Sequence, residues 1–210
     1  MSSDEPLLTI VVVTYNQAEH WLPCFLHSCA LQTRKDFRVE VWHDGMDGWS
    51  YRNTADLVNK FHDDYTFPVY MRGSIERTND FGHSMRASAL TQCGTKYINW
   101  QNGDNYLTPR FVELFLNAAE SSNLDFVYSN LLHNYANVNG DGQGPYNVLI
   151  SHPHLNRIDI ANFVVKTEWA QKVGFNHRDS GADGKFVNEL MAHKDQLRIG
   201  KMNCVPVVHN

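Results

Sequence analysis

Residues 7–14 read LLTIVVVT, a short apolar run that is rich in β-branched side chains. Such a run is typical of a strand that is buried on both faces, as central strands of parallel sheets are. The polar residues Tyr15-Asn16-Gln17 end the run, and apolar residues then recur at helical spacing from Ala18 to Ala30. The segment therefore predicts a strand, a polar loop and a helix in direct succession, which is the repeating unit of an α/β fold.

The same unit returns along the first half of the chain. The run RVEVW at 38–42 predicts a second strand, and the polar stretch HDGMDGWS separates it from a helix. Strands that alternate with helices predict a mostly parallel central sheet flanked by helices. Besides 38–42, the expected strands are 67–71 and 97–101, and the expected helices are 53–62 and 84–93.

Residues 100–106 read WQNGDNY, and their Asn-Gly-Asp has two interpretations. These residue types favour tight turns, but an aspartate at a strand end can also bind a cation. The segment that follows, LTPRFVELFLNAAE, predicts a helix with Thr108 as its N-cap and Pro109 in its first turn. Because a hairpin would continue into an alternating second strand, we interpret Asn-Gly-Asp as a strand-to-helix loop.

The second half of the sequence is less regular. We expect strands at 125–133 and 159–165, and helices at 167–173 and 182–193. A second Asn-Gly-Asp lies in the glycine-rich stretch NVNGDGQGPY at 137–146. No strand-to-helix pattern surrounds it, so we interpret it as a flexible turn.

Composition limits the possible classes of protein. The 210 residues are 42% hydrophobic, enough for one substantial core, so we expect a single domain over residues 1–210. The net charge of -5, without a basic stripe, argues against a nucleic-acid partner. No apolar run approaches the roughly 20 residues of a membrane span, and the acidic start MSSDEPLL is unlike a signal peptide. We expect a cytoplasmic protein of undetermined oligomeric state, and the ending VPVVHN favours a piece of a longer one.

Polar loops follow three of the predicted strands, with the sequences TYN, HDG and QNGD. Parallel sheets bind ligands at the carboxyl ends of their strands, where these loops would meet. A divalent cation allows carboxylates and phosphates to share such a site without repulsion. The loops therefore predict a site for a cation and a phosphate compound.

These motifs, in this order, resemble the family 2 glycosyltransferases of the GT-A fold. VVVTYN matches the first strand of that family, HDG stands at the place of its Asp-Asp-Gly-Ser, and GHSMRASALTQCGTKYI precedes WQNGD, where the family has its metal-binding D-x-D. Further on, ANFVVKTEWAQKVGFN is similar to the segment before the acceptor site, and SGADGKFV to the region of the catalytic base. Each piece is weak alone, but together they cover nearly the whole chain.

The resemblance implies a GT-A, Rossmann-like fold with a nucleotide-sugar-binding half (residues 1–106) and an acceptor-binding half (residues 107–210). It also implies an inverting transfer of a hexose or 6-deoxyhexose from a UDP-sugar, with Mn²⁺ or Mg²⁺, to a hydroxyl of a glycan or glycoprotein. The chain further resembles capsid glycosyltransferase domains of chloroviruses, which implies glycosylation of a viral capsid in the host cytoplasm.

Roles in nucleotide-sugar binding carry over where positions match the family. Thr14 and Tyr15 would line the nucleotide base, and Asp44 would accept a hydrogen bond from the base or ribose. Arg86 would face the diphosphate, whose geometry a guanidinium matches, and a solvent-exposed helix arginine is the alternative. Asp104 matches the last aspartate of the D-x-D and would bind the cation and the donor, and Gly103 would let the strand end bend towards them.

Other positions carry the metal and catalytic roles. Asn102 replaces the first aspartate of the D-x-D, so we expect it to be a weak metal ligand. His43 likewise replaces an acidic residue of the family. Asp183 would be the general base that takes the proton of the acceptor hydroxyl, with Asp179 as its rival. His209 stands where some relatives have a metal-binding histidine.

Two other functions compete with a glycosyltransferase. The loss of one carboxylate at Asn102 is consistent with a catalytically weakened GT-A domain that only binds carbohydrate or a partner protein. Because binding alone needs no base, the presence of both Asp104 and Asp183 favours the enzyme. A sugar nucleotidyltransferase would carry a glycine-rich, basic loop after the first strand, and TYNQAEHW has neither property.

Overall fold

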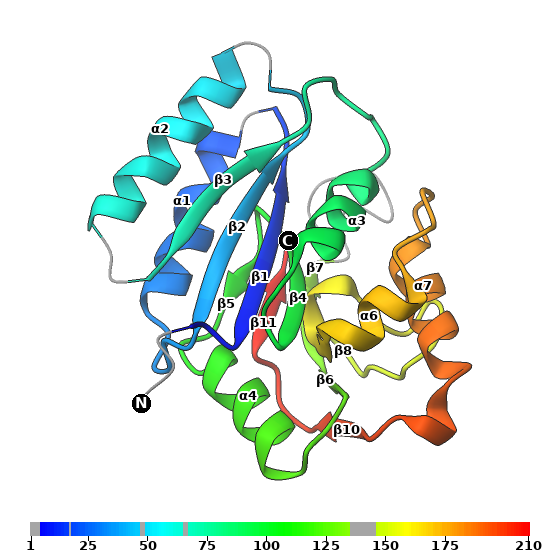
Figure 1. Cartoon of the computed structure of the whole chain (residues 1–210). Helices are drawn as coiled ribbons and strands as arrows, with labels where there is room; N and C mark the ends of the chain where they lie inside the picture. Colours follow the sequence, from blue (N-terminus) through cyan, green and yellow to red (C-terminus); the bar gives the residue numbers. More distant parts are fainter. Residues whose placement is uncertain (1–4, 17, 47–48, 65–66, 135–145) are drawn as a thin grey trace.

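The computed structural model describes residues 5–16, 18–46, 49–64, 67–134 and 146–210. A mostly parallel sheet lies in the middle of the molecule, and helices cover both of its faces (Figure 1). This arrangement confirms the α/β fold that the strand and helix patterns predicted.

The first half contains each strand and helix that the sequence predicts, with bounds that differ by a few residues. The apolar runs become strands because their side chains are buried on both sides of the sheet. The elements are β1 (Leu8–Thr14), α1 (Ala18–Ala30), β2 (Phe37–His43), α2 (Trp49–Asp64), β3 (Val69–Gly73), α3 (His83–Gln92) and β4 (Tyr97–Asn102).

The second half departs more from the expected pattern. The predicted strand 125–133 is two strands, and the predicted strand 159–165 begins as a short 3-10 helix. The glycine-rich stretch 137–146 lies almost wholly outside the described residues. The elements are β5 (Tyr106–Leu107), α4 (Phe111–Ser121), β6 (Phe126–Ser129), β7 (Leu131–Asn134), β8 (Tyr146–Leu149), η1 (Ile160–Asn162), β9 (Phe163–Lys166), α6 (Thr167–Val173), α7 (Ala182–Met191), η2 (Lys194–Gln196), β10 (Ile199–Met202) and β11 (Val207–His209).

Asn130 is the residue at which the predicted strand 125–133 breaks. Its backbone N–H donates to Cys204 O at 3.1 Å, and its side-chain oxygen accepts a hydrogen bond from Ser151 N at 3.1 Å. These bonds take the backbone out of the main sheet, so β6 and β7 belong to different sheets. Both partners are distant in sequence, which is why the local pattern did not reveal the break.

The main sheet has seven strands in the order β10-β6-β9-β4-β1-β2-β3. β9 runs antiparallel to β4 and β6, and the other pairs are parallel. The register places Thr14 opposite His43 and Val13 opposite Asn102. The loops after β1, β2 and β4 therefore leave the sheet side by side, as the sequence predicted.

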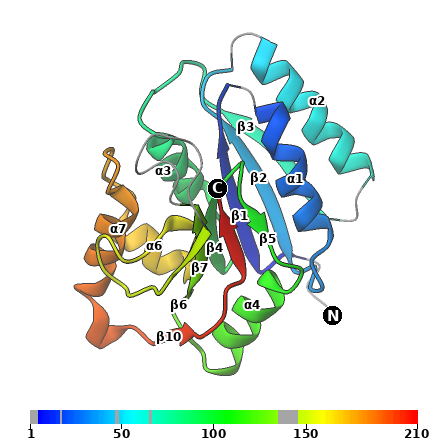
Figure 2. The same ribbon diagram turned by 180° about the vertical axis from the view of Figure 1, so that it is seen from behind.

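A second, four-stranded sheet has the order β5-β11-β7-β8. β11 lies antiparallel to β5, with Val208 opposite Tyr106, and parallel to β7 (Figure 2). This pairing brings the end of the chain beside the WQNGDNY loop. Because β4 and β5 belong to different sheets, the loop is not a hairpin, as the helical pattern after it predicted.

The core lies on both faces of the main sheet. Alternate residues of β1 point in opposite directions, so Leu8, Ile10 and Val12 pack with α1, α2 and α4, whereas Val11 and Val13 pack with α3, α6 and α7. All five are buried. Full burial of such a side chain stabilises the fold by about 1.5–3 kcal/mol.

Helix α4 begins differently from the sequence prediction. It starts at Phe111, so Thr108 and Pro109 lie before the helix and Thr108 is not its N-cap. The buried side chain of Gln32 takes over that role, because its Oε1 accepts a hydrogen bond from Val112 N at 3.0 Å. Gln32 also donates to Thr108 O at 2.8 Å, which fixes the turn before the helix. The predicted cap was wrong because a distant side chain satisfies the helix terminus.

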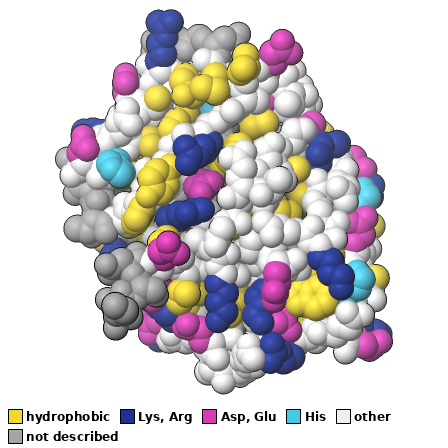
Figure 3. Space-filling model, viewed as in Figure 1, with side chains coloured by type: hydrophobic (Ala, Val, Ile, Leu, Met, Phe, Trp, Pro, Cys, Tyr) yellow, Lys and Arg dark blue, Asp and Glu magenta, His cyan; other side chains and the backbone are white. Residues whose placement is uncertain are grey.

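The surface carries charges of both signs. On the face shown in Figure 3, acidic and basic side chains are interspersed rather than gathered into one large patch. Among the described residues, none of the helices has the length and apolar character needed to cross a bilayer.

Candidate functional site

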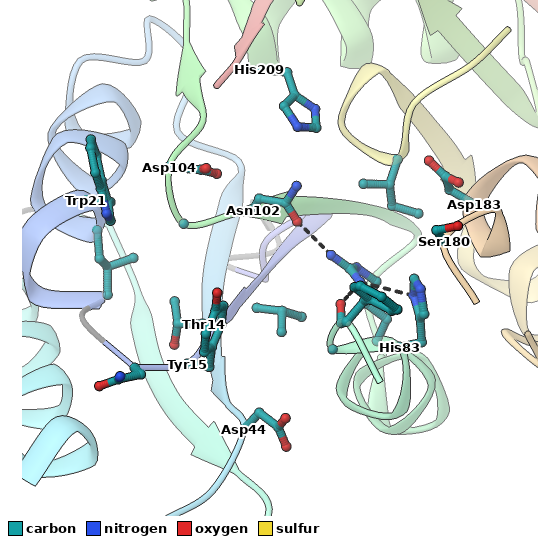
Figure 4. A pocket seen from close by; sticks show the side chains of 18 of the residues that line it. Thr14, Tyr15, Trp21, Asp44, His83, Asn102, Asp104, Ser180, Asp183 and His209 are labelled. Atoms are coloured by element: carbon teal, nitrogen blue, oxygen red, sulfur yellow. Dashed lines mark hydrogen bonds between the residues drawn. The ribbon is translucent and has the colours of Figure 1, made fainter. Parts of the chain in front are cut away.

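A cavity of about 820 Å³ opens at the carboxyl ends of β1, β2 and β4 (Figure 4). Its walls come from both the 1–106 half and the 107–210 half of the chain. A cavity of this size is in the range of sites that hold a small molecule or cofactor. Every residue that the sequence predicted for the site lines it: Thr14, Tyr15, Asp44, Arg86, Asn102, Gly103, Asp104, Asp183 and His209.

Thr14 and Tyr15 form the wall at the end of β1. Thr14 Oγ1 lies 3.0 Å from His43 Nδ1, so His43 supports Thr14 instead of lining the cavity. The side chain of Tyr15 is 57% exposed, and the guanidinium of Arg77 lies 5.0 Å from its ring centre. An exposed aromatic ring beside a cation offers a flat surface on which a planar ring of a ligand can stack. Arg77 was not predicted, because no local motif marks it.

Asp44 lies at the end of β2 and holds the segment that leads into α3. Its Oδ1 accepts hydrogen bonds from Thr78 N at 2.8 Å and Thr78 Oγ1 at 2.9 Å, and its Oδ2 accepts one from Asn79 N at 3.2 Å. Ser74 Oγ adds a longer contact to Oδ1 at 3.3 Å. Since a carboxylate oxygen can accept two hydrogen bonds, Oδ2 still has capacity for a ligand.

Arg86 is buried in the first turn of α3, so the interpretation as an exposed helix arginine is wrong. Its Nη2 donates to Asn102 Oδ1 at 2.6 Å, and its Nη1 donates to Phe81 O at 2.8 Å and lies 3.2 Å from His83 Nδ1. Burial lowers the pKa of Arg86, although the charge of Asp183 opposes this. Within the described residues no carboxylate forms an ion pair with it, so its charge is available to an anionic ligand.

Residues 102–105 form a tight turn, in which Asn105 N donates to Asn102 O at 3.2 Å. Asn102 Oδ1, the predicted metal ligand atom, accepts the hydrogen bond of Arg86 (dashed in Figure 4). Gly103 does not adopt a positive φ. A Cβ atom at this position would lie 3.1 Å from Thr14 Cγ2, so glycine provides room beside β1. The turn therefore depends on a close approach and not on a left-handed backbone.

Asp104 lies within this turn and lines the cavity. Burial raises the pKa of its carboxyl group, while the positive charge of His209 partly opposes the rise. Asn210 Nδ2 donates to Asp104 O at 2.6 Å, which continues the pairing of β5 with β11. The second sheet thus places Asp104 and His209 together, although they are far apart in the sequence (Figure 4).

His209 forms a cluster with two residues that the sequence analysis missed. Its Nδ1 lies 2.9 Å from Asp159 Oδ2, and its ring stacks on that of His133 with centroids 4.5 Å apart. Burial would lower the pKa of His209, but the charges of Asp159 and Asp104 outweigh it and raise the pKa. The contact with Asp159 and the stacking on His133 together hold the His209 ring in place. No local pattern marks Asp159 or His133, because their contacts depend on the second sheet.

Asp183 lies in the first turn of α7 and lines the cavity. Burial raises the pKa of its carboxyl group to about 6, and the negative charge of Asp159 contributes to the rise. Its rival Asp179 is exposed, forms an ion pair with Lys185 and does not line the cavity. Of the two aspartates, Asp183 is the one placed to exchange a proton with a bound molecule.

The start of α7 is fixed by close packing. A Cβ atom at Gly184 would lie 2.8 Å from Leu155 Cα, so only glycine allows the helix to approach this loop. Gly184 N donates to Asp183 Oδ1 at 2.9 Å. The lack of a side chain at Gly184 therefore sets the position of α7, and the backbone N–H of this residue orients the Asp183 carboxylate.

The donor atoms in the cavity suit a divalent cation. Asp104 offers carboxylate oxygens and His209 offers an imidazole nitrogen, and both types are ligands of Mn²⁺-like metals. Burial keeps water from competing fully for these groups. The residues present therefore fit a cation at this end of the cavity.

Comparisons with known proteins agree with this arrangement. The model of the family described as glycosyl transferase family 2 matches residues 9–175, so the chain belongs to this family. No curated protein sequence matches the chain.

Three solved structures illustrate the shared fold. S. aureus TarS 1-349 superimposes with a TM-score of 0.73 at 16% identity, over 97% of this chain and 60% of that one. TarS 1-349 in complex with UDP-GlcNAc gives 0.76 at 15% identity, over 97% and 58%. The mannosyltransferase PcManGT from Pyrobaculum calidifontis, in complex with GDP-Man and Mn²⁺, gives 0.69 at 15% identity, over 98% and 57%. The chain thus spans about 60% or less of the length of these proteins.

Proposed function

We propose that the chain is a metal-dependent, inverting glycosyltransferase that moves a hexose or 6-deoxyhexose from a UDP-sugar to a hydroxyl of a glycan or glycoprotein. One observation carries the proposal: a single cavity contains a buried arginine, a carboxylate and an imidazole of the types that bind cations, and a second carboxylate whose pKa is raised to about 6. These are the groups needed to bind a diphosphate, to hold a cation and to accept a proton.

The donor would lie across the ends of β1, β2 and β4. Tyr15 would stack on the base, Thr14 would line it, and the free position on Asp44 Oδ2 would accept a hydrogen bond from it. Arg86 would bind the diphosphate through its guanidinium. Structures with UDP-GlcNAc and with GDP-Man and Mn²⁺ superimpose on this chain, which supports a nucleotide sugar as the ligand.

In the proposed reaction the acceptor hydroxyl oxygen attacks the anomeric carbon from the face opposite the diphosphate. The bond from this carbon to the phosphate oxygen breaks, and UDP leaves with the bonding electrons. Asp183 takes the hydroxyl proton as the new bond forms. Arg86 stays beside the diphosphate and stabilises its negative charge. A cation bound at Asp104 and His209 would supply further neutralisation of the charge on UDP.

The release of UDP from UDP-sugars, with and without Mn²⁺, tests this function. We expect slow, Mn²⁺-dependent hydrolysis of at least one donor in the absence of an acceptor. If no donor is hydrolysed and UDP with Mn²⁺ causes no thermal shift, the proposal is wrong. Binding of UDP-sugars without turnover would indicate a carbohydrate-binding module, and release of pyrophosphate from UTP and a sugar phosphate would indicate a nucleotidyltransferase.

The rate of transfer should depend on pH. A base must be deprotonated, and the pKa of Asp183 is raised to about 6, so kcat should rise as the pH passes through about 6 and then level off. An ordinary aspartate would show this rise about two pH units lower. The pH profile of kcat under saturating donor and cation measures this limb, and a rate that stays constant down to about pH 4.5 would argue against Asp183 as the base.

Asn102→Asp tests whether this position is a metal ligand. Asn102 Oδ1 accepts a hydrogen bond from Arg86 Nη2 at 2.6 Å, so a carboxylate here would form an ion pair with Arg86. We expect the Mn²⁺ affinity to change less than about threefold, and the affinity for UDP to fall because Arg86 is neutralised. Titrations of Mn²⁺ and UDP measure both. A Mn²⁺ affinity tenfold or more above that of wild type would show that residue 102 binds the cation directly.

A further inference from the structure

Asp159 is largely enclosed, with 13% of its side chain exposed, and lines the cavity without a proposed contact to the donor or the acceptor. It precedes η1 as its N-cap, and its Oδ1 accepts a hydrogen bond from Ala161 N at 2.9 Å. Its own N–H donates to Asn162 Oδ1 at 3.2 Å. The second carboxylate oxygen, Oδ2, lies 2.9 Å from His209 Nδ1. The capping box thus holds the carboxylate in one orientation, with Oδ2 directed at the imidazole.

Asn162 ties this arrangement to the main sheet. Its Nδ2 donates to Ser129 O and to Ser151 Oγ, both at 2.6 Å, and the residue is fully buried. Ser129 ends β6, so Asn162 anchors the segment that carries Asp159 to a strand of the main sheet. A carboxylate supported in this way can orient its neighbour with little freedom of its own.

The cluster of His133, Asp159 and His209 has two possible uses. Its three ligand atoms lie within 4.8 Å of one another, which is suggestive of a separate cation site. However, the two imidazole rings stack with an interplanar angle of 23°, so their in-plane lone pairs do not converge on one point between them. The geometry therefore favours a different use.

We propose that Asp159 is a positioning residue that holds His209 Nδ1 so that Nε2 is presented to the cation bound beside Asp104. The proposal rests on the proposed function, because it places the cation in the donor cavity. His133 stacks on the ring and limits its rotation. In Figure 4 the His209 ring lies on the same side of the cavity as Asp104. At 2.9 Å, the Asp159 carboxylate pairs with a His209 ring whose Nδ1 carries the proton, which leaves the lone pair on Nε2.

Asp159→Asn gives a sharp test because of Ala161. The Ala161 N–H can only donate, so the amide oxygen of the new asparagine would face it and the amide NH₂ would face His209 Nδ1. Nδ1 must then act as an acceptor, and the ring proton moves to Nε2. This is the wrong tautomer for a metal ligand, since Nε2 needs a free lone pair. The substitution removes one charge and leaves the size of the side chain unchanged.

Two measurements on the whole chain follow from this. Nitrogen NMR of His209 at alkaline pH should show Nδ1 protonated in wild type and Nε2 protonated in Asp159→Asn. Titration of Mn²⁺ in the presence of UDP should show an affinity about 10- to 100-fold weaker in Asp159→Asn. Adding Asp159→Asn to His209→Ala should not lower the Mn²⁺ affinity further, because Asp159 acts through the imidazole.

Asp125→Asn is the matched control. Asp125 is buried and pairs with Lys166 and Arg198, but it lies outside the cavity. Its replacement should lower stability without changing the Mn²⁺ affinity.

Three outcomes would overturn the proposal. If wild type binds Mn²⁺ and Asp159→Asn binds it equally well, the proposal fails and the proposed function stands. If the double variant Asp159→Asn with His209→Ala binds Mn²⁺ much more weakly than His209→Ala alone, Asp159 is itself a ligand of the cation. If wild type binds no Mn²⁺ with UDP, the proposed metal-dependent function fails as well.

Discussion

Asp183→Asn should lower kcat for sugar transfer by about 10²- to 10⁴-fold and leave the affinity for UDP nearly unchanged. The amide has the size of the carboxylate and can still accept the hydrogen bond from Gly184 N, but it cannot take a proton from the acceptor. Burial raises the pKa of Asp183 to about 6, so the charged side chain is unfavourable in the folded state near neutral pH. The neutral asparagine should therefore not lower the Tm, and the loss of rate is separable from unfolding.

Asp179→Asn is the control for this prediction. It makes the same chemical change four residues earlier, at an exposed side chain paired with Lys185 outside the cavity. An exposed ion pair of this kind contributes little to stability, so this variant should keep nearly full activity. Steady-state kinetics of both variants with one donor and acceptor decide the assignment. If Asp179→Asn loses as much rate as Asp183→Asn, or if Asp183→Asn loses UDP binding, the base is misplaced.

The central part of the fold could be predicted because its signals are local. A buried strand such as β1 needs a continuous apolar run, and the helix after it needs apolar residues at helical spacing; both patterns are visible in the sequence. The parallel order then places the ends of β1, β2 and β4 together without further information. This is why the residues expected in the cavity line it, even though their roles rest on a family resemblance.

The parts that were missed depend on contacts between distant residues. Asn130 leaves the sheet because of Cys204 and Ser151, and α4 starts late because Gln32 satisfies its terminus. The local pattern around these residues fits one continuous strand at 125–133 and a helix capped by Thr108, so the sequence alone favoured those elements. Asp159 was assigned to a strand for the same reason, although its contact with His209 links residues 50 positions apart.

Asp104→Asn should abolish the dependence of UDP binding on Mn²⁺ and lower the rate of transfer by about 10²- to 10³-fold, the usual effect of removing one group that stabilises developing charge. In the proposed cation site Asp104 supplies the carboxylate, because Asn102 Oδ1 accepts a hydrogen bond from Arg86. Titration of UDP with and without Mn²⁺ measures the first effect, and initial rates measure the second. Binding of UDP without Mn²⁺ should change little, because the proposed stacking of the uracil base on the exposed Tyr15 ring does not involve Asp104.

The stability of this variant separates a lost ligand from a damaged fold. Burial raises the pKa of Asp104 above its unfolded value, so the native state holds this proton more tightly than the unfolded chain. Stability from this group therefore falls as the pH rises through the raised pKa, and the charge is a net cost above it. Asparagine removes that cost, so at neutral pH the Tm should equal or exceed that of wild type. The exposed Asp56 provides the control, since Asp56→Asn should alter neither Mn²⁺-dependent binding nor rate. A variant at Asp104 that keeps Mn²⁺-dependent UDP binding would show that the cation is held elsewhere, and the role of His209 would have to be reconsidered with it.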